Sequence, residues 1–295
     1  MAEARELSDE ELRQMQLLQL GMVEELDRVC RKHGITYAIS DGTLLGAVRH
    51  QGYIPWDDDA DISMLRSEYE KFKAVAHELD PDICFFQDHS TDPAYRWGYG
   101  KLRRTGTVYI RPGQEHVPSQ TGVFIDIFPW DGIPKSLPGM VLNDAYCAFL
   151  RKATYSAVGK RSADASAAAR LAFGLLSRIP IDWVHERFEA MAARYNRQEG
   201  GRVRIYAWPA LGRQTNDHPL RELYGIPKEW LQNTEDYSFE GKIFRGVAAD
   251  DDYLKYMYGN YWELPPEDQR HPHTPASVFD IGEALDILKR KGKHL

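Results

Sequence analysis

The sequence predicts an α/β (α+β) protein in which helices flank a mixed β-sheet. A long amphipathic pattern near the N-terminus predicts one helix, and short apolar runs between turn residues predict several strands within residues 1–135. After Pro134 the pattern becomes helical, and turn residues are frequent again from about residue 200. We therefore expect a core at 1–135, a helical segment at 136–235, and a C-terminal segment at 236–295 that packs back on the core.

The first helix has clear signals at both ends. Ser8 and Glu11 have the spacing of a capping box, which marks a helix start. Gly34 is a typical helix stop. The apolar residues between these ends recur every three or four positions, as one helix face requires; they are Leu12, Met15, Leu18, Met22, Leu26 and Val29. The sequence therefore predicts a helix over 9–33.

The other predicted elements are shorter. Residues 123–128 (VFIDIF) form the clearest strand, and we expect Pro129 to end it. Further strands are predicted at 35–40, 60–64, 83–87, 97–103 and 108–110, and helices at 43–50 and 67–79. Later in the chain, helices are predicted at 142–155, 163–176, 183–198 and 251–258, and a hairpin strand at 239–247.

The composition is that of an ordinary soluble globular protein, with 43% hydrophobic and 27% charged residues in a chain of 295. A net charge of −7 argues against a nucleic-acid partner. No apolar run is long enough for a membrane span, and the N-terminus lacks the apolar part of a signal peptide. Cys30, Cys84 and Cys147 are too scattered for a disulfide framework or a zinc site. The expected location is the cytoplasm.

The C-terminus carries a basic tail of four residues, Lys289, Arg290, Lys291 and Lys293. Two interpretations remain open: a solvated end, or weak attraction to an anionic lipid or polymer. The second would bring a cytoplasmic protein to the inner face of a membrane.

Acidic residues form the most distinctive cluster. Asp57, Asp58, Asp59 and Asp61 lie within five positions, and on a strand Asp59 and Asp61 would share a face. Carboxylates so placed could hold one or two Mg²⁺ ions, whereas the alternative is a solvated acidic loop. Asp126 lies within an apolar strand, where a carboxylate needs a partner. It could be a third metal ligand or accept a proton from a hydroxyl, or it could pair with backbone or an arginine.

Five further residues are candidates for binding phosphate. Gly42 and Thr43 open a predicted helix just before the aspartates, and free N–H groups at a helix start favour phosphate. Arg49 and His50 end the same helix, and Lys101 lies on another predicted strand. Cationic side chains of this kind bind phosphate oxygens. The alternatives are an ordinary turn for the first pair and surface positions for the others.

Three segments resemble the LicD family. The most specific is residues 41–62, DGTLLGAVRHQGYIPWDDDADI, which resembles the family signature. Residues 124–134, FIDIFPWDGIP, are similar to a second family block, and residues 253–270, YLKYMYGNYWELPPEDQR, to a C-terminal block. The last departs from the family pattern at Asn260, where Asp is usual, and at Trp262, where Met is usual. The middle of the chain matches no family motif.

The resemblance implies a nucleotidyltransferase-like core. It makes Gly42 and Thr43 the phosphate-binding turn, Asp59 and Asp61 metal ligands, and Asp126 the third carboxylate. Family members transfer a phosphorylated alcohol, typically phosphocholine from CDP-choline, onto teichoic acid or lipopolysaccharide sugars. Relatives similar to fukutin-related proteins use CDP-ribitol.

We therefore expect a phosphotransferase that uses Mg²⁺ or Mn²⁺, a CDP-activated alcohol as donor, and a glycan or lipid-linked glycan as acceptor. Other CDP-alcohols, ribitol or glycerol, remain open. So do a DxD glycosyltransferase, a transferase that attaches the nucleotide itself, a two-carboxylate glycosidase, and a non-catalytic glycan-binding module. The helix predicted over 9–33 argues against the glycosyltransferase, because those enzymes begin with a nucleotide-binding sheet. The three acidic residues argue against a binding module.

Overall fold

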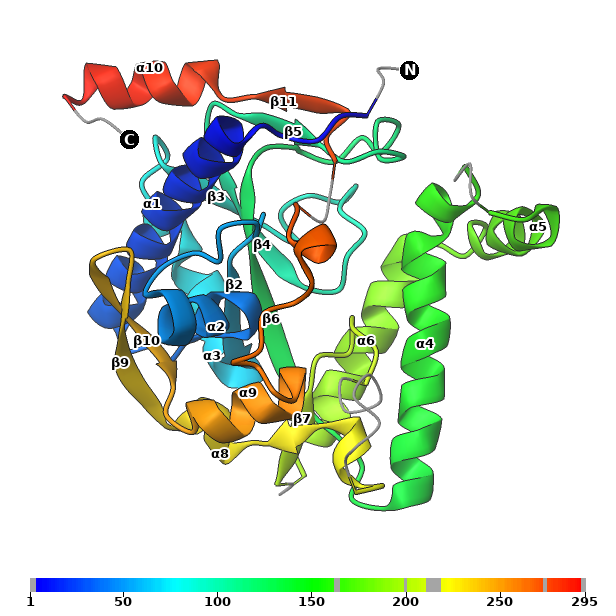
Figure 1. The fold of residues 1–295 in the computed structure, drawn as a ribbon. Helices are drawn as coiled ribbons and strands as arrows, with labels where there is room; N and C mark the ends of the chain where they lie inside the picture. The colour runs from blue at the N-terminus through cyan, green and yellow to red at the C-terminus, as the bar shows by residue number, and fades with distance from the viewer. Residues whose placement is uncertain (1–3, 162–164, 199–200, 211–218, 273–274, 293–295) are drawn as a thin grey trace.

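The computed structural model describes residues 4–161, 165–198, 201–210, 219–272 and 275–292 (Figure 1). Its helices are α1 (Asp9–His33), α2 (Asp41–His50), α3 (Arg66–Val75), α4 (Leu137–Gly159), α5 (Ala167–Leu176), α6 (Ile181–Asn196), α8 (Glu229–Gln232), α9 (Asp250–Tyr258) and α10 (Gly282–Arg290). Its strands are β1 (Ala38–Ile39), β2 (Asp61–Leu65), β3 (Cys84–Gln87), β4 (Gly100–Arg104), β5 (Val108–Ile110), β6 (Phe124–Gly132), β7 (Arg202–Arg204), β8 (Ile226–Pro227), β9 (Thr234–Phe239), β10 (Lys242–Val247) and β11 (Val278–Asp280). Short 3₁₀ turns cover Ala76–Glu78, Glu222–Tyr224 and Glu267–Gln269.

A mixed sheet with flanking helices confirms the predicted fold class. The strand order is β3-β4-β6-β2-β1-β10-β9, and β7 pairs with both β6 and β8. Strands β2 and β6 are parallel, with Asp61 opposite Asp126, whereas β4 is antiparallel to β6, with Lys101 opposite Asp126. Strand β10, more than 200 residues further along the chain, pairs in parallel with β1. The register thus places three ionisable residues side by side on three neighbouring strands.

Helix α1 confirms the prediction for residues 9–33. The Ser8 hydroxyl accepts a hydrogen bond from the Glu11 N–H, the Glu11 carboxylate accepts one from the Ser8 N–H, and Gly34 ends the helix with φ of 62°. Its apolar face packs against β4 and β6. The fully buried residues of that face are Met15, Met22, Val23, Leu26, Val29 and Cys30.

The prediction that Pro129 ends its strand was wrong, because β6 continues to Gly132. Proline has no N–H to donate and is tolerated where no neighbouring strand needs that donor. Strand β4 begins at Gly100, opposite Ile127, so Pro129 lies beyond the β4 ladder. On its other side, Pro129 lies opposite Met64 of β2. Residues of β6 beyond Pro129 pair with β7.

Several element boundaries also differ from the predictions; the predicted hairpin strand 239–247, for example, is the pair β9 and β10, and the helix predicted at 142–155 is the longer α4. Strand β1 covers only Ala38–Ile39 of the predicted 35–40, because the N–H of Thr36 donates to the Glu68 carboxylate, at 3.0 Å, rather than to a strand. Helix α2 begins at Asp41, two positions before the predicted start. The prediction for 67–79 divides into α3 and a 3₁₀ turn.

Helices α4, α5 and α6 occupy the first part of the predicted helical segment 136–235, whereas strands β7 and β8 lie in its second part. Helices α4 and α6 form a second apolar core with residues near β7; its buried members include Cys147, Leu150, Val184, Phe188 and Tyr206. Helix α5 has no buried residue. The predicted start of this helix, at 163, falls outside the described residues. Among the described helices, none combines the length and apolar content that crossing a bilayer requires.

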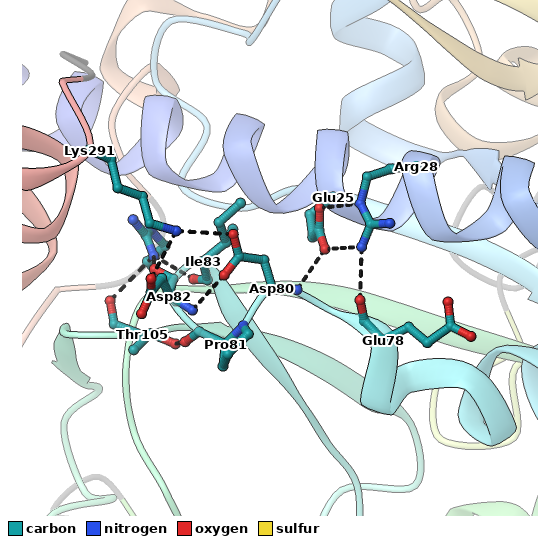
Figure 2. A network of polar contacts seen from close by, with 10 residues as sticks. Glu25, Arg28, Glu78, Asp80, Pro81, Asp82, Ile83, Thr105 and Lys291 are labelled. Atoms are coloured by element: carbon teal, nitrogen blue, oxygen red, sulfur yellow. Dashed lines mark hydrogen bonds and ion pairs between the residues drawn. The ribbon is translucent and has the colours of Figure 1, made fainter.

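The C-terminal segment is fastened to the core through a polar network. Figure 2 shows Lys291 between Asp80 and Asp82, at 3.1 and 2.9 Å. In the same network Glu25 of α1 accepts from Arg28, at 2.6 Å, and from the N–H of Asp80, at 2.7 Å. Lys289 of the same basic tail pairs with Asp286, at 3.4 Å. Two residues of the basic tail are therefore paired within the chain, and Lys293 lies outside the described residues.

Candidate active site

Three carboxylates converge near the start of β2. Oxygens of Asp59, Asp61 and Asp126 all lie within 4.8 Å of one another. The parallel register of β2 and β6 causes this proximity, because it sets Asp61 directly opposite Asp126. Oxygens of Asp57, Asp58 and Asp59 form a second group within 4.8 Å, so that Asp59 belongs to both groups. We call these five residues the acidic cluster.

The acidic cluster concentrates negative charge in a buried place. Burial, with Asp58 and Asp126 nearby, raises the pKa of Asp59 to about 7. Burial and the neighbouring carboxylates, Asp59 foremost, raise the pKa of Asp61 well above its ordinary value. Within the described chain, the buried Oδ2 atom of Asp58 has no hydrogen-bond partner. Buried like charges and unpaired hard oxygens fit a site for a divalent cation such as Mg²⁺.

The first turn of α2 lies directly against the acidic cluster. A Cβ atom on Gly42 would lie 2.6 Å from Oδ2 of Asp57, so a larger residue here would displace the Asp57 carboxylate. Thr43 accepts a hydrogen bond from the N–H of Asp61, at 2.8 Å, and so helps to position that residue. Asp41 has φ of +49°, and burial raises its pKa to about 6. Strained non-glycine backbone of this kind is frequent at functional sites.

Lys101 contacts the third carboxylate. Its Nζ atom forms an ion pair with Oδ1 of Asp126 and lies 3.3 Å from the centre of the Phe124 ring. Burial, with Arg103 and Arg111 nearby, lowers the pKa of Lys101 to about 7 even though Asp126 opposes this shift. Lys101 therefore both holds Asp126 and faces the pocket beyond it.

That pocket has a volume of about 180 Å³ and a lining rich in cations. We call it the basic pocket. Its cationic lining residues are Arg96, Lys101, Arg103 and Arg111, and its aromatic ones are Trp97, Tyr99, Tyr109 and Phe124. Lys101 and Arg103 alternate on β4 and so share one face of the sheet. This alternation of basic residues in the sequence indicated a basic face of the sheet. Among the cations of the pocket, only Lys101 was predicted to bind phosphate.

Arg49 and His50 lie elsewhere, at the far end of α2 from Gly42 and Thr43. Arg49 donates to the carbonyl of Tyr261, at 2.5 Å, and lines a second hollow of about 490 Å³ with Trp56. Burial and the adjacent arginine lower the pKa of His50. The structure thus brings the aspartates, Gly42, Thr43 and Lys101 together. It places Arg49 in a separate hollow, and the His50 ring lies 6.2 Å from the ring of Trp56.

Two buried glutamines of α1 position the acidic segment, and the sequence predictions missed them. The Gln19 amide donates to the carbonyls of Asp58, at 3.0 Å, and Phe124, at 3.1 Å. Gln16 donates to the carbonyl of Asp57, at 3.0 Å. Polar amides on an otherwise apolar helix face were the signal in the sequence.

Replacing Gln19 by leucine is expected to lower the free energy of unfolding by about 2 kcal/mol or more. Two buried carbonyls would lose their donor, and each unpaired buried group costs ~1–3 kcal/mol. Urea denaturation measures the change, with Gln14→Leu on the same helix as the control, for which we expect less than ~0.5 kcal/mol. If the two substitutions lowered the free energy of unfolding equally, the hydrogen bonds of Gln19 to Asp58 and Phe124 would not stabilise the acidic segment.

Carboxylates that can hold a divalent cation, beside cations that can hold phosphate oxygens, define an enzyme that transfers a phosphorus-containing group. Residues 34–137 match the family model described as LicD/FKTN/FKRP, nucleotidyltransferase domain. The chain is also 26% identical over 275 residues to the lipopolysaccharide cholinephosphotransferase LicD of Haemophilus influenzae, which covers 91% of this chain and 97% of that protein. The chain thus carries a LicD-type nucleotidyltransferase domain at residues 34–137, and its similarity to LicD over most of its length supports a phosphotransferase.

Two shorter similarities involve uncharacterized proteins. One, from Rickettsia typhi, is 43% identical over 54 residues, which is 18% of each chain. The other, from Rickettsia prowazekii, is 47% identical over 47 residues, or 16% of this chain and 18% of that one. The family resemblance inferred from the sequence motifs is confirmed by the family model and the full-length relative.

Proposed function

We propose that this enzyme transfers phosphocholine from CDP-choline to a sugar hydroxyl of lipopolysaccharide or a related cell-envelope glycan precursor. The full-length similarity to a lipopolysaccharide cholinephosphotransferase supports the transferred group and the acceptor class. The observation that carries the chemistry is the convergence of Asp59, Asp61 and Asp126 beside the basic pocket.

In the proposed reaction, the acceptor oxygen attacks the phosphorus that bears choline. The bond from this phosphorus to the bridging oxygen breaks, and CMP leaves with the bonding electrons. Asp59, Asp61 and Asp126 would hold Mg²⁺ or Mn²⁺, which would neutralise charge on the diphosphate. One oxygen of Asp126 is held by Lys101, and the carboxylate is placed to accept the proton of the acceptor hydroxyl.

The turn at the start of α2 would bind the donor phosphates. Gly42 leaves room for close approach of the backbone, and Thr43 keeps Asp61 in place. The helix dipole favours negative charge at this end. In this proposal, the residues position the donor and neutralise its charge, which is how phosphoryl transfer is mainly catalysed.

A donor screen tests the proposal. The purified chain would be incubated with Mg²⁺, a delipidated lipopolysaccharide acceptor, and each of CDP-choline, CDP-ribitol, CDP-glycerol and a nucleotide sugar. We expect CMP release from CDP-choline that requires the acceptor and stops when EDTA is added. CMP release only from CDP-ribitol or CDP-glycerol would mean that the transferred alcohol is ribitol or glycerol rather than choline. Release of a nucleoside diphosphate from the nucleotide sugar would support a glycosyltransferase instead.

A further inference from the structure

Two arginines of the basic pocket, Arg96 and Arg103, bind neutral groups, whereas Arg111 also lies near the carboxylates of Asp58, Asp59 and Asp126, which raise its pKa. Arg96 donates to the carbonyls of Thr154, at 2.8 Å, and Ala153, at 3.2 Å. Arg103 donates to the side-chain oxygen of Gln87, at 2.7 Å, and to the carbonyl of Gly122, at 2.9 Å. Neither arginine forms an ion pair with a carboxylate of the described residues, so their charge is held by neutral groups. Buried cations without a counter-charge are costly unless an anion binds.

Arg111 completes this arrangement between the basic pocket and the acidic cluster. Its buried Nε atom has no hydrogen-bond partner in the described chain. Its guanidinium carbon lies 4.8 Å from the centre of the Phe124 ring, and that of Arg103 lies 5.0 Å from the same ring. The two guanidinium groups and Lys101 thus gather around one aromatic ring, directly beside Asp126.

We infer that the basic pocket binds one phosphate group of a substrate, chiefly through Arg103 and Arg111. Planar guanidinium groups bind phosphate oxygens in pairs. The volume of about 180 Å³ is smaller than the roughly 300–1,000 Å³ typical of sites that enclose a drug-sized ligand, and so suits a single phosphate group. This inference rests on the proposed function, in which the phosphate belongs either to the nucleotide of the donor or to the acceptor glycan.

Isothermal titration calorimetry with EDTA present tests the pocket without any turnover. The probes are inorganic phosphate, CMP and glucose 6-phosphate. We expect Arg111→Gln to weaken phosphate binding by about tenfold to a hundredfold, since hydrogen bonds to charged groups contribute this much. Arg103→Gln should act in the same direction. Arg104→Gln is the matched control, because Arg104 follows on the same strand, is also buried, and donates only to backbone carbonyls away from the pocket.

The probes identify the source of the phosphate. Tighter binding of CMP than of phosphate, together with a raised KM for CDP-choline in Arg111→Gln, would assign the phosphate to the donor. Tighter binding of glucose 6-phosphate with an unchanged donor KM would assign it to the acceptor. Equal affinities for the Arg111→Gln and Arg104→Gln variants, or no phosphate binding by the unsubstituted chain, would overturn the inference. Because the assay needs no catalysis, its outcome is separate from that of the donor screen.

A second inference concerns α5, which lies at the outer end of α4, away from the sheet (Figure 1). One side of α5 packs on α4, where the Phe173 and Tyr155 rings are 5.7 Å apart. Another side carries a fully apolar stripe at the spacing of one helix face, and its large members are Leu171, 69% exposed, and Leu175, 55% exposed. Its small members are Ala168 and Ala172, both exposed. We call these four residues the α5 stripe.

The sequence segment that carries the α5 stripe is basic. Between Asp144 and Asp182 it contains six basic residues and one acidic residue, Asp164, whereas the chain has a net charge of −7. The basic residues nearest α5 in sequence are exposed; they are Lys160, Arg161, Arg170 and Arg178. An apolar helix face with basic residues around it is the pattern of helices that lie on anionic membranes.

We propose that the α5 stripe docks on the surface of an anionic lipid bilayer. Leu171 and Leu175 would enter the interface, and the surrounding basic residues would contact lipid phosphates. The complementary charge favours an anionic bilayer over a second copy of this acidic chain. This contact lies on the helical segment rather than on the C-terminal tail, where Lys291 is paired with Asp80 and Asp82.

Vesicle flotation of the full chain tests this docking. We expect binding to vesicles of phosphatidylcholine with phosphatidylglycerol, and weak binding to phosphatidylcholine alone. The double variant Leu171→Glu, Leu175→Glu should reduce the bound fraction at least about tenfold, since each buried leucine contributes that much. Ile243→Glu is the matched control, because Ile243 is 53% exposed on β10.

Absence of binding to the anionic vesicles, or equal loss in the double variant and the control, would overturn the proposal. So would a dimer of the unsubstituted chain, seen by light scattering, that the double variant converts to a monomer, because the α5 stripe would then be a subunit interface. An unchanged melting temperature of the double variant would confirm that it is folded.

Discussion

Replacing Asp61 by asparagine is expected to reduce phosphocholine transfer at least about 100-fold, which is the scale of losing one charge-stabilising group in an active site. In the proposed site, Asp61 is a metal ligand together with Asp59 and Asp126. Steady-state CMP release at saturating CDP-choline measures the loss. Asp82→Asn is the control, because Asp82 pairs with Lys291 outside the acidic cluster.

The same substitution is expected to leave the metal-free protein equally stable or more stable. Burial raises the pKa of Asp61 well above its ordinary value, so its ionised form destabilises the folded state near neutral pH, and asparagine removes that charge. Added Mg²⁺ should raise the melting temperature of the unsubstituted chain more than that of Asp61→Asn. Retained transfer with unchanged metal dependence in Asp61→Asn would contradict the metal-ligand assignment.

Replacing Arg66 by methionine is expected to lower the free energy of unfolding by about 3–5 kcal/mol, because it leaves a buried carboxylate without its counter-charge. Arg66 binds Asp131 through two hydrogen bonds of 2.9 and 2.8 Å. The Asp131 side chain is 1% exposed and also accepts from Asn196, at 2.7 Å. The pair joins α3, β6 and α6 behind the site.

Urea denaturation of Arg66→Met measures this loss, with Lys255→Met as the control. Lys255 pairs with Asp251 one helical turn away, and both side chains are more than half exposed, 62% and 54%. Exposed pairs of this kind contribute less than ~1 kcal/mol. A loss in Arg66→Met as small as that in the control would mean that water reaches Asp131 and that the pair does not fasten the helices to the sheet.

The features predicted from the sequence are those that depend on short-range patterns. Helix α1 was predicted with its bounds because its cap, apolar period and stop all lie within 27 residues, from Ser8 to Gly34. Asp59 and Asp61 are two positions apart in the sequence. Their proximity therefore followed from strand geometry, in which such residues share a face. The place of Asp126 beside them came from the family resemblance, and the parallel register of β2 and β6 supplies its physical reason.

The features that the sequence did not reveal depend on contacts between distant segments. The parallel pairing of β10 with β1 joins residues more than 200 positions apart, and no local pattern encodes it. The Gln19 bonds to Asp58 and Phe124 bridge a helix to two other segments. Pro129 was misjudged because its tolerance within β6 depends on where the neighbouring strand β4 begins.

In the proposed reaction, the group transferred is phosphocholine, rather than the nucleotide or a sugar. Mass spectrometry of the acceptor glycan, after incubation with CDP-choline and Mg²⁺, distinguishes these three groups. We expect the acceptor to gain one phosphocholine group and the solution to gain CMP, with both changes absent in Asp61→Asn. An acceptor that gains a cytidylyl group, or CMP release without any change in the acceptor, would contradict the account.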